Sequence, residues 1–205
     1  LPAPTKRQYA MAQFLQGPGD RKILEAWRGA AKSWITAAFV LWLLYQDQTL
    51  NVVVVSASKQ RADAFTTFLM RLVEEIPELQ FLRPRADQRN SRQAFDVGPA
   101  PPSQTPSVIS VGITSTFTGH RASVIVADDV ESPNNSDTEA LREKLRERIS
   151  EFESLLKPGG KIIFLGTPQC DDSIYNELID KTRDEDGSPL FVTRMVPVRY
   201  PSAAR

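Results

Sequence analysis

The sequence is poor in cysteine and histidine and has no excess charge of either sign. Cys170 is the single cysteine among 205 residues, so no internal disulfide and no cysteine-based zinc site can form, which suits a reducing compartment. The 25 basic and 25 acidic residues give a formal net charge of +0. This balance argues against a basic protein that coats nucleic acid, although a local basic patch remains compatible with it.

Long hydrophobic runs, a signal-peptide pattern, internal repeats and low-complexity tracts are also missing. The most apolar run, residues 34–45, is shorter than the roughly 20 residues that cross a bilayer, and it is better explained as a buried helix. The sequence begins at Leu1 rather than Met, which leaves open that it is a piece of a longer protein. We expect one domain over residues 1–205.

Apolar β-branched runs alternate with segments of helical spacing. We expect strands over residues 21–27, 51–56, 107–112, 124–127, 161–165 and 190–196, and helices over 31–46 and 59–75, from 136 onward and after 172. A capping box over 136–139 begins the third helix, whose apolar face runs to Leu156. The alternation predicts a three-layer α/β fold with a mainly parallel central sheet.

Residues 83–106 break this regular pattern. Five prolines punctuate the segment, and arginines at 83, 85, 89 and 92 charge it. We expect a long surface excursion that is partly mobile. Its arginines are candidates for contact with DNA phosphates, and simple solvation is the alternative.

The most informative segment, residues 23–34, is typical of a phosphate-binding loop between a strand and a long helix. In such loops backbone N–H groups surround the phosphates, a lysine reaches the β/γ oxygens, and the next hydroxyl holds Mg²⁺. Lys32 and Ser33 fit these positions, but Ala26 and Ala31 replace the two glycines of the usual pattern. An ordinary helix start is the alternative. Because a left-handed alanine costs about 1–2 kcal/mol, we expect Ala31 to adopt a conformation open to alanine.

Acidic residues follow the apolar strand at 124–127. Asp128 is placed to hold Mg²⁺ at the carboxyl end of the strand, near the phosphate loop. Either Asp129 or Glu131 is then the candidate that orients the attacking water, and the spacing does not choose between them. A solvated strand-to-loop turn is the alternative, but the pairing with Lys32 and Ser33 disfavours it.

Another expected strand, residues 161–165, is followed directly by Gly166, Thr167 and Pro168. A hydroxyl at a carboxyl strand end can contact the γ-phosphate or the attacking water and transmit the loss of that phosphate. A simple Gly-Pro turn is the alternative for this segment.

These three motifs, in this order, resemble the ATPase domain of a tailed-bacteriophage large terminase, particularly of the podovirus type, and the resemblance covers almost the whole chain. It implies a P-loop NTPase fold of the ASCE type that binds ATP and Mg²⁺. The implied nucleotide-binding positions include Gly29, Ala30 and Trp27, with core packing as the alternative for the tryptophan. Gln8 would read the adenine edge.

The resemblance also implies candidates for a catalytic arginine. Arg28 lies within the loop and would act in its own subunit, whereas Arg121 would reach into a neighbouring site; a surface salt bridge is the alternative for each. The pattern departs from the family at Ala31 and at Asp129, where many relatives carry glutamate. Thr167 would couple hydrolysis to movement.

The family further implies partners and a location. These are double-stranded DNA, a portal protein, a small terminase subunit and further copies of the chain in a ring, with no membrane, in the host cytoplasm and transiently at the procapsid portal. A following nuclease domain is not expected within these 205 residues. A helicase-like DNA translocase and a non-hydrolysing nucleotide-binding scaffold are the alternatives.

Overall fold

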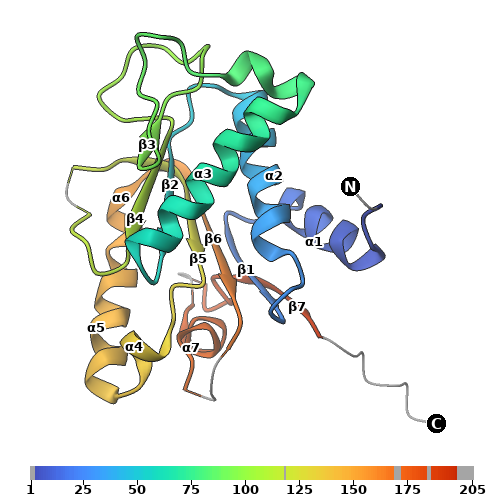
Figure 1. Ribbon diagram of the computed structural model, residues 1–205. Coiled ribbons are helices and arrows are strands. Elements are labelled where there is room, and N and C mark those ends of the chain that lie inside the picture. Colours follow the sequence, from blue (N-terminus) through green and yellow to red (C-terminus); the bar gives the residue numbers. More distant parts are fainter. Residues whose placement is uncertain (1–2, 118, 169–171, 184–185, 198–205) are drawn as a thin grey trace.

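A central sheet with helices on both faces forms the molecule (Figure 1). The computed structural model describes residues 3–117, 119–168, 172–183 and 186–197. The sheet has the order β3-β4-β2-β5-β6-β1-β7, and only the β3–β4 pair is antiparallel. Its strands are β1 (Arg21–Ala26), β2 (Val52–Ser56), β3 (Ala94–Phe95), β4 (Val108–Gly112), β5 (Ala122–Asp128), β6 (Leu156–Gly166) and β7 (Val192–Val196).

Two groups of helices cover the two faces of the sheet, which confirms the three-layer α/β prediction. One face carries α1 (Lys6–Gln16), α2 (Lys32–Gln46), α3 (Lys59–Glu75) and the 3₁₀ helix η1 (Pro77–Leu82). The other side carries α4 (Pro133–Ser136), α5 (Glu139–Ser150), α6 (Phe152–Leu155) and α7 (Ile174–Lys181). Each face has its own apolar cluster, and the central strands are buried on both sides.

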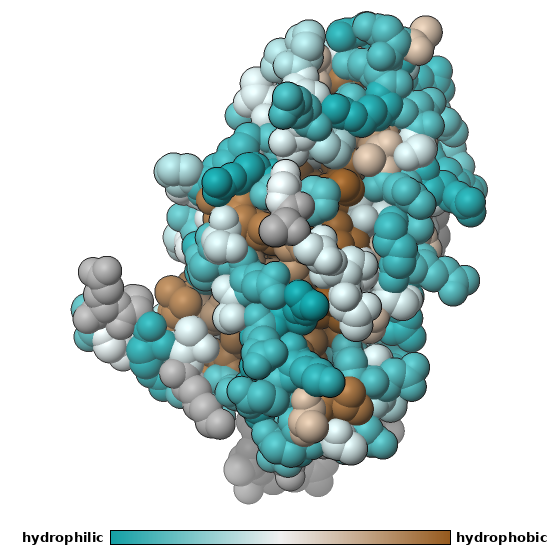
Figure 2. Space-filling view, turned by 90° about the vertical axis from the view of Figure 1, so that its left-hand side faces the viewer, coloured by the Kyte–Doolittle hydropathy of each residue, from teal (hydrophilic) through white to brown (hydrophobic). Residues whose placement is uncertain are grey.

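The described helices are all too short or too polar to span a membrane. Figure 2 shows the side of the molecule formed by the left of Figure 1, where hydrophilic side chains cover most of the surface and apolar ones lie in hollows. One hollow of about 570 Å³ lies between α5 and the residues after β4, and Ile113, Leu141 and Leu145 contribute its apolar lining.

Several predicted boundaries need correction. The helix α1 was not expected, because its capping box of Thr5 and Gln8 was interpreted only as a binding segment. The capping box expected over residues 136–139 is also wrong: Thr138 caps α5, and the box in this region joins Ser132 to Asn135. Leu156 begins β6 instead of ending a helical face, because the chain pairs with β5 from that point.

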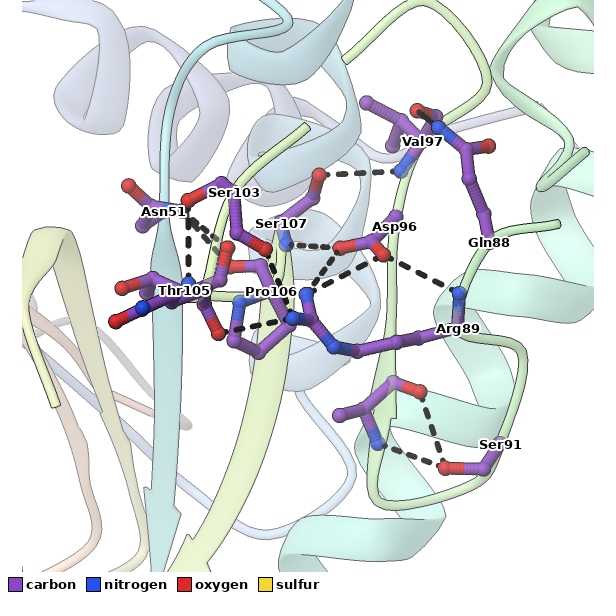
Figure 3. Close-up of polar contacts among 12 residues, drawn as sticks. Asn51, Gln88, Arg89, Ser91, Asp96, Val97, Ser103, Thr105, Pro106 and Ser107 are labelled. Carbon is purple, nitrogen blue, oxygen red and sulfur yellow. Dashed lines mark hydrogen bonds and ion pairs between the residues drawn. The ribbon is translucent and has the colours of Figure 1, made fainter. Parts of the chain in front are cut away.

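The excursion over residues 83–106 is more organised than its sequence suggests. Phe95 and Val97, which belong to this segment, are fully buried, so it is not wholly a surface excursion. Arg89 forms an ion pair with Asp96 at 3.1 Å and donates hydrogen bonds to the backbone carbonyls of Ser103 and Gln104 (Figure 3). Arg89 is therefore engaged in contacts within its own segment, at the amino-terminal edge of the sheet.

Candidate nucleotide site

The three sequence motifs meet at one edge of the sheet. The neighbouring strands β5, β6 and β1 are parallel, and their register pairs Asp128 with Leu165 and Glu25 with Gly166. The carboxyl ends of these strands therefore lie side by side, where ligands bind in open α/β sheets. Asp128 ends β5, Thr167 directly follows β6, and Lys32 begins α2 after the loop that follows β1.

The loop between β1 and α2 turns through two left-handed residues. Gly29 has φ 87° and Ala31 has φ 67°, so the expectation that Ala31 avoids this conformation is wrong. The short connection must reverse the chain before Lys32, and that reversal fixes the backbone of Ala31. Ala31 offers no side-chain cap, so the first N–H groups of α2 are left for an anion to bind.

Lys32 points back over the ends of β1 and β6. Its ammonium donates hydrogen bonds to the carbonyl of Ala26 and to the hydroxyl of Thr167, both at 2.8 Å. Its side chain is buried, and burial lowers the pKa of Lys32, while the charge of Asp129 and then that of Asp128 oppose this shift. A cation in these surroundings favours an anionic ligand.

Ser33 and Asp128 face each other across the site. The Ser33 hydroxyl lies 3.1 Å from each carboxylate oxygen of Asp128. Burial, together with the neighbouring charge of Asp129, raises the pKa of Asp128 to about 6. A dication bound between these oxygens would relieve the repulsion between the Asp128 and Asp129 carboxylates, which is the chemistry expected of a magnesium site.

Asp129 and Glu131 differ in their surroundings. Asp129 has a left-handed backbone with φ 44°, and its N–H donates to the Leu165 carbonyl at 2.9 Å. Among the carboxylates, its charge does most to oppose the lowering of the Lys32 pKa. Glu131 is buried, and its carboxylate accepts a short hydrogen bond from the Ser173 hydroxyl.

A cavity of about 520 Å³ opens beside these groups. Loop and strand ends supply one wall and α3 supplies the other; the charged or polar lining residues are Arg28, Ser33, Arg61, Asp128, Asp129, Glu131 and Ser132. Sequence reasoning missed Arg61, because only the parallel pairing of β2 with β5 brings the first turn of α3 to this edge.

Other predicted residues lie away from the cavity lining. Arg121 immediately precedes β5, at the opposite edge of the sheet from Asp128, and donates to the Ser154 carbonyl at 3.3 Å. Gln8 accepts hydrogen bonds from Thr5 in the α1 capping box. Trp27 packs partly buried against the core with the Arg7 guanidinium 5.1 Å from the centre of its ring.

Glu25 is a further residue that the sequence did not single out. It is only 1% exposed, and neither of its carboxylate oxygens has a hydrogen-bond partner among the residues that the structure describes. Burial raises the pKa of Glu25, and the charge of Lys32 opposes this effect. The sequence could not reveal it, because β1 also contains Arg21 and Lys22, and a third charged residue in this strand is unremarkable.

Comparison with known proteins shows what this chain is similar to. No family model matches the chain. The large terminase subunit of Enterobacteria phage T3 is 47% identical over 204 residues, which is 98% of this chain and 34% of that protein. The chain thus spans about a third of the length of this relative.

Solved structures share the fold at low sequence identity. The large terminase ATPase domain of Thermus phage P74-26 matches with a TM-score of 0.53 and 14% identity, over 93% of this chain and 80% of that one. A DEAD-box protein from Methanococcus jannaschii matches with a TM-score of 0.50 and 12% identity, over 93% and 49%. The fold is therefore that of a P-loop NTPase, and over nearly its whole length the chain is similar in sequence to about a third of the phage T3 terminase large subunit.

Proposed function

We propose that this chain is the ATP-hydrolysing motor domain of a terminase that drives double-stranded DNA into a procapsid. One observation carries the proposal: Lys32, the Ser33–Asp128 pair and Thr167 converge on the same sheet edge. The match to the phage T3 terminase large subunit supports the packaging role. The proposal thus rests on the arrangement of these side chains and not on the fold alone, because one fold can serve many functions.

The loop from Arg28 to Ser33 fits a triphosphate. Its uncapped helix start offers N–H donors, and Lys32 offers an amine whose pKa burial lowers while the charges of Asp129 and Asp128 oppose that lowering. In this proposal Lys32 exchanges its bonds to Ala26 and Thr167 for bonds to the β/γ oxygens. Removing it should abolish the interaction that holds the terminal phosphate.

Ser33 and Asp128 fit Mg²⁺, which prefers oxygen ligands and retains water and substrate phosphates as the remaining ligands. The described residues contain no group of three or more acidic, histidine or cysteine side chains that would form an all-protein metal cage. Bound at this pair, the ion would neutralise charge that develops on the phosphates.

Asp129 is the carboxylate that we assign to the attacking water. It follows Asp128 directly, it lines the cavity, and its charge opposes the lowering of the Lys32 pKa more than the charge of Asp128 does, which supports a role next to the phosphate-binding ammonium. Its backbone is left-handed, and its N–H is bonded to the Leu165 carbonyl at the end of β6, which restricts the position of the residue. Asp129→Asn is expected to retain ATP binding and to lose turnover by roughly 10² or more.

Arg28 is the arginine that we assign to transition-state stabilisation within the same subunit, because it lines the cavity together with Ser33 and Asp129. Arg121 lies at the far edge and could serve only a neighbour's site. Mixing inactive Arg28→Ala protein with inactive Lys32→Ala protein, which still carries Arg28, tests whether Arg28 acts within its own subunit or in a neighbour. Unrestored activity in the mixture supports the assignment, and restored activity contradicts it.

Gln8 and Trp27 remain our proposed contacts to adenine, on α1 and in the phosphate loop. DNA, a portal protein, a small terminase subunit and a ring of further copies are the proposed partners, in the host cytoplasm and at the procapsid portal. Thr167, already bonded to Lys32, is proposed to transmit hydrolysis to movement.

The full-length protein tests the function directly. We expect DNA packaging into procapsids that requires ATP and Mg²⁺ and is lost in Lys32→Ala, with an Arg71→Ala variant on the exposed side of α3 as control. ATP-driven strand separation without packaging would favour the helicase-like alternative. Nucleotide binding without turnover, even with DNA and the assembled ring, would favour the scaffold.

A further inference from the structure

The amino end of α7 lies beneath the loop that carries Asp129. Ser173 caps this helix and is completely buried, and its hydroxyl donates a short hydrogen bond to the Glu131 carboxylate. The same hydroxyl lies 3.4 Å from the backbone nitrogen of Tyr175, in the first turn of α7. One serine thus ties the start of α7 to the end of the acidic motif.

The two carboxylate oxygens of Glu131 differ in their hydrogen bonding. It is 5% exposed, and within the described residues its Oε1 has no hydrogen-bond partner. Burial raises the pKa of Glu131, and the hydrogen bonds from Ser173, from the backbone of Ile174 and from the Ser136 side chain oppose the rise. A buried carboxylate with one oxygen unsatisfied adds little to stability, so fold stability is a poor explanation for a glutamate here.

A second contact from α7 reaches the same loop through β6. The Tyr175 hydroxyl lies 3.4 Å from the Leu165 carbonyl, which also accepts the N–H of Asp129 at 2.9 Å. The ring of Tyr175 packs against Gly166 so closely that an added Cβ would stand 2.7 Å from it. The first turn of α7 therefore contacts both the Asp129 anchor and the Glu131 side chain.

We propose that Glu131 is a positioning residue: through its bond to Ser173 it fixes the short loop from Asp129 to Glu131 and so sets where the Asp129 carboxylate stands relative to Lys32. The inference rests on the proposed role of Asp129 in ATP hydrolysis. The strained backbone of Asp129, at φ 44°, needs such a support to stay in place. Because the support acts on the water-orienting group, its loss lowers kcat and leaves KM for ATP nearly unchanged.

Steady-state ATP hydrolysis by the full-length protein tests this, with four variants. Glu131→Ala and Ser173→Ala should each lower kcat at least about tenfold while KM changes less than about twofold. Glu131→Gln keeps an oxygen that accepts the Ser173 bond, and Ser173→Thr keeps the hydroxyl; both should recover kcat to within about threefold of wild type. Thermal unfolding checks that each variant is folded.

Opposite outcomes overturn the inference. If Glu131→Gln is as inactive as Glu131→Ala, the carboxylate charge itself acts on the water. Unchanged kcat in Ser173→Ala shows that the bond positions nothing. A wild-type protein that hydrolyses no ATP contradicts the proposed function as well, whereas normal turnover in both wild type and Ser173→Ala contradicts this inference alone.

Glu177→Gln provides a matched control on the same helix. Glu177 pairs with Arg146 at 2.7 Å and fastens α7 to α5 without touching the acidic loop. We expect reduced thermal stability with kcat unchanged in this variant. If it lowers kcat as much as Ser173→Ala, general docking of α7 explains the effect, and the specific role of Glu131 is wrong.

Discussion

The Lys32 ammonium donates a hydrogen bond to the Thr167 hydroxyl at 2.8 Å, although the residues lie 135 positions apart in the chain. The Thr167 hydroxyl also donates to the Ala26 carbonyl, the second acceptor of Lys32, at 2.8 Å. This closed set of bonds joins the phosphate loop to the end of β6. It gives a direct route by which a ligand that attracts Lys32 would also affect Thr167.

Thr167→Val should therefore destabilise the nucleotide-free protein. The buried ammonium loses one of its two described acceptors, at a cost of about 1–2 kcal/mol in the free energy of unfolding. Urea denaturation measures the change, with Thr167→Ser as the control that keeps the hydroxyl. Equal stability of the valine and serine variants would show that this hydrogen bond contributes nothing.

Asp128→Asn should stabilise the nucleotide-free protein at neutral pH. The folded carboxyl holds its proton to about pH 6, while the unfolded one loses it near 3.8, so deprotonation favours unfolding as pH rises through this window. The variant escapes this cost, which amounts to at most about 3 kcal/mol. It should nevertheless lose Mg²⁺-dependent turnover.

Unfolding free energies of wild type and Asp128→Asn, compared from about pH 4 to pH 7, test that sign. The difference between them should be small at the acidic end and grow toward neutrality. A constant or shrinking difference would mean that Asp128 is ionised normally in the folded protein.

Much of this fold could be predicted from hydrophobic periodicity. The β-branched runs predicted the central strands because such strands are buried on both faces, and the spacing over residues 59–75 matched α3. The sequence also allowed the prediction that four site residues lie close together, because the carboxyl ends of parallel strands share one edge of the sheet. These residues are Lys32, Ser33, Asp128 and Thr167. Their residue types were already suited to phosphate and Mg²⁺.

Other parts depend on contacts between distant segments. The Glu131–Ser173 bond and the position of Arg61 arise only when α7 and α3 dock on the sheet. The conformation of Ala31 follows from the reversal between β1 and α2, which overrides the preference of alanine. Local propensity cannot report such constraints, because the rest of the fold imposes them.

Ala31→Gly should raise the stability of the protein. Glycine removes the strain of the left-handed backbone at φ 67° but adds freedom to the unfolded chain, which leaves a net gain of about 0.5–1 kcal/mol. Ala30→Gly is the matched control, because the neighbouring alanine has no positive φ and should lose stability. Thermal denaturation that shows both glycines destabilising would contradict the observed loop conformation.

Arg89→Ala should loosen the excursion without affecting ATP turnover. Arg89 binds Asp96 and two backbone carbonyls of that segment, at the amino-terminal edge of the sheet and away from the candidate site. Amide hydrogen exchange should accelerate over residues 96–107, while exposed Arg92→Ala serves as the control. Unchanged exchange in Arg89→Ala would show that other contacts hold the segment.

A crystal structure of the protein with Mg²⁺ and a non-hydrolysable ATP analogue tests the central claim most directly. We expect the triphosphate on the loop before α2, with Lys32 at its β/γ oxygens, the ion at Ser33 and Asp128, and the Asp129 carboxylate facing the γ-phosphate. A triphosphate bound elsewhere, or Lys32 and Asp128 contacting different ligands, would contradict the convergence of the strand ends on one nucleotide.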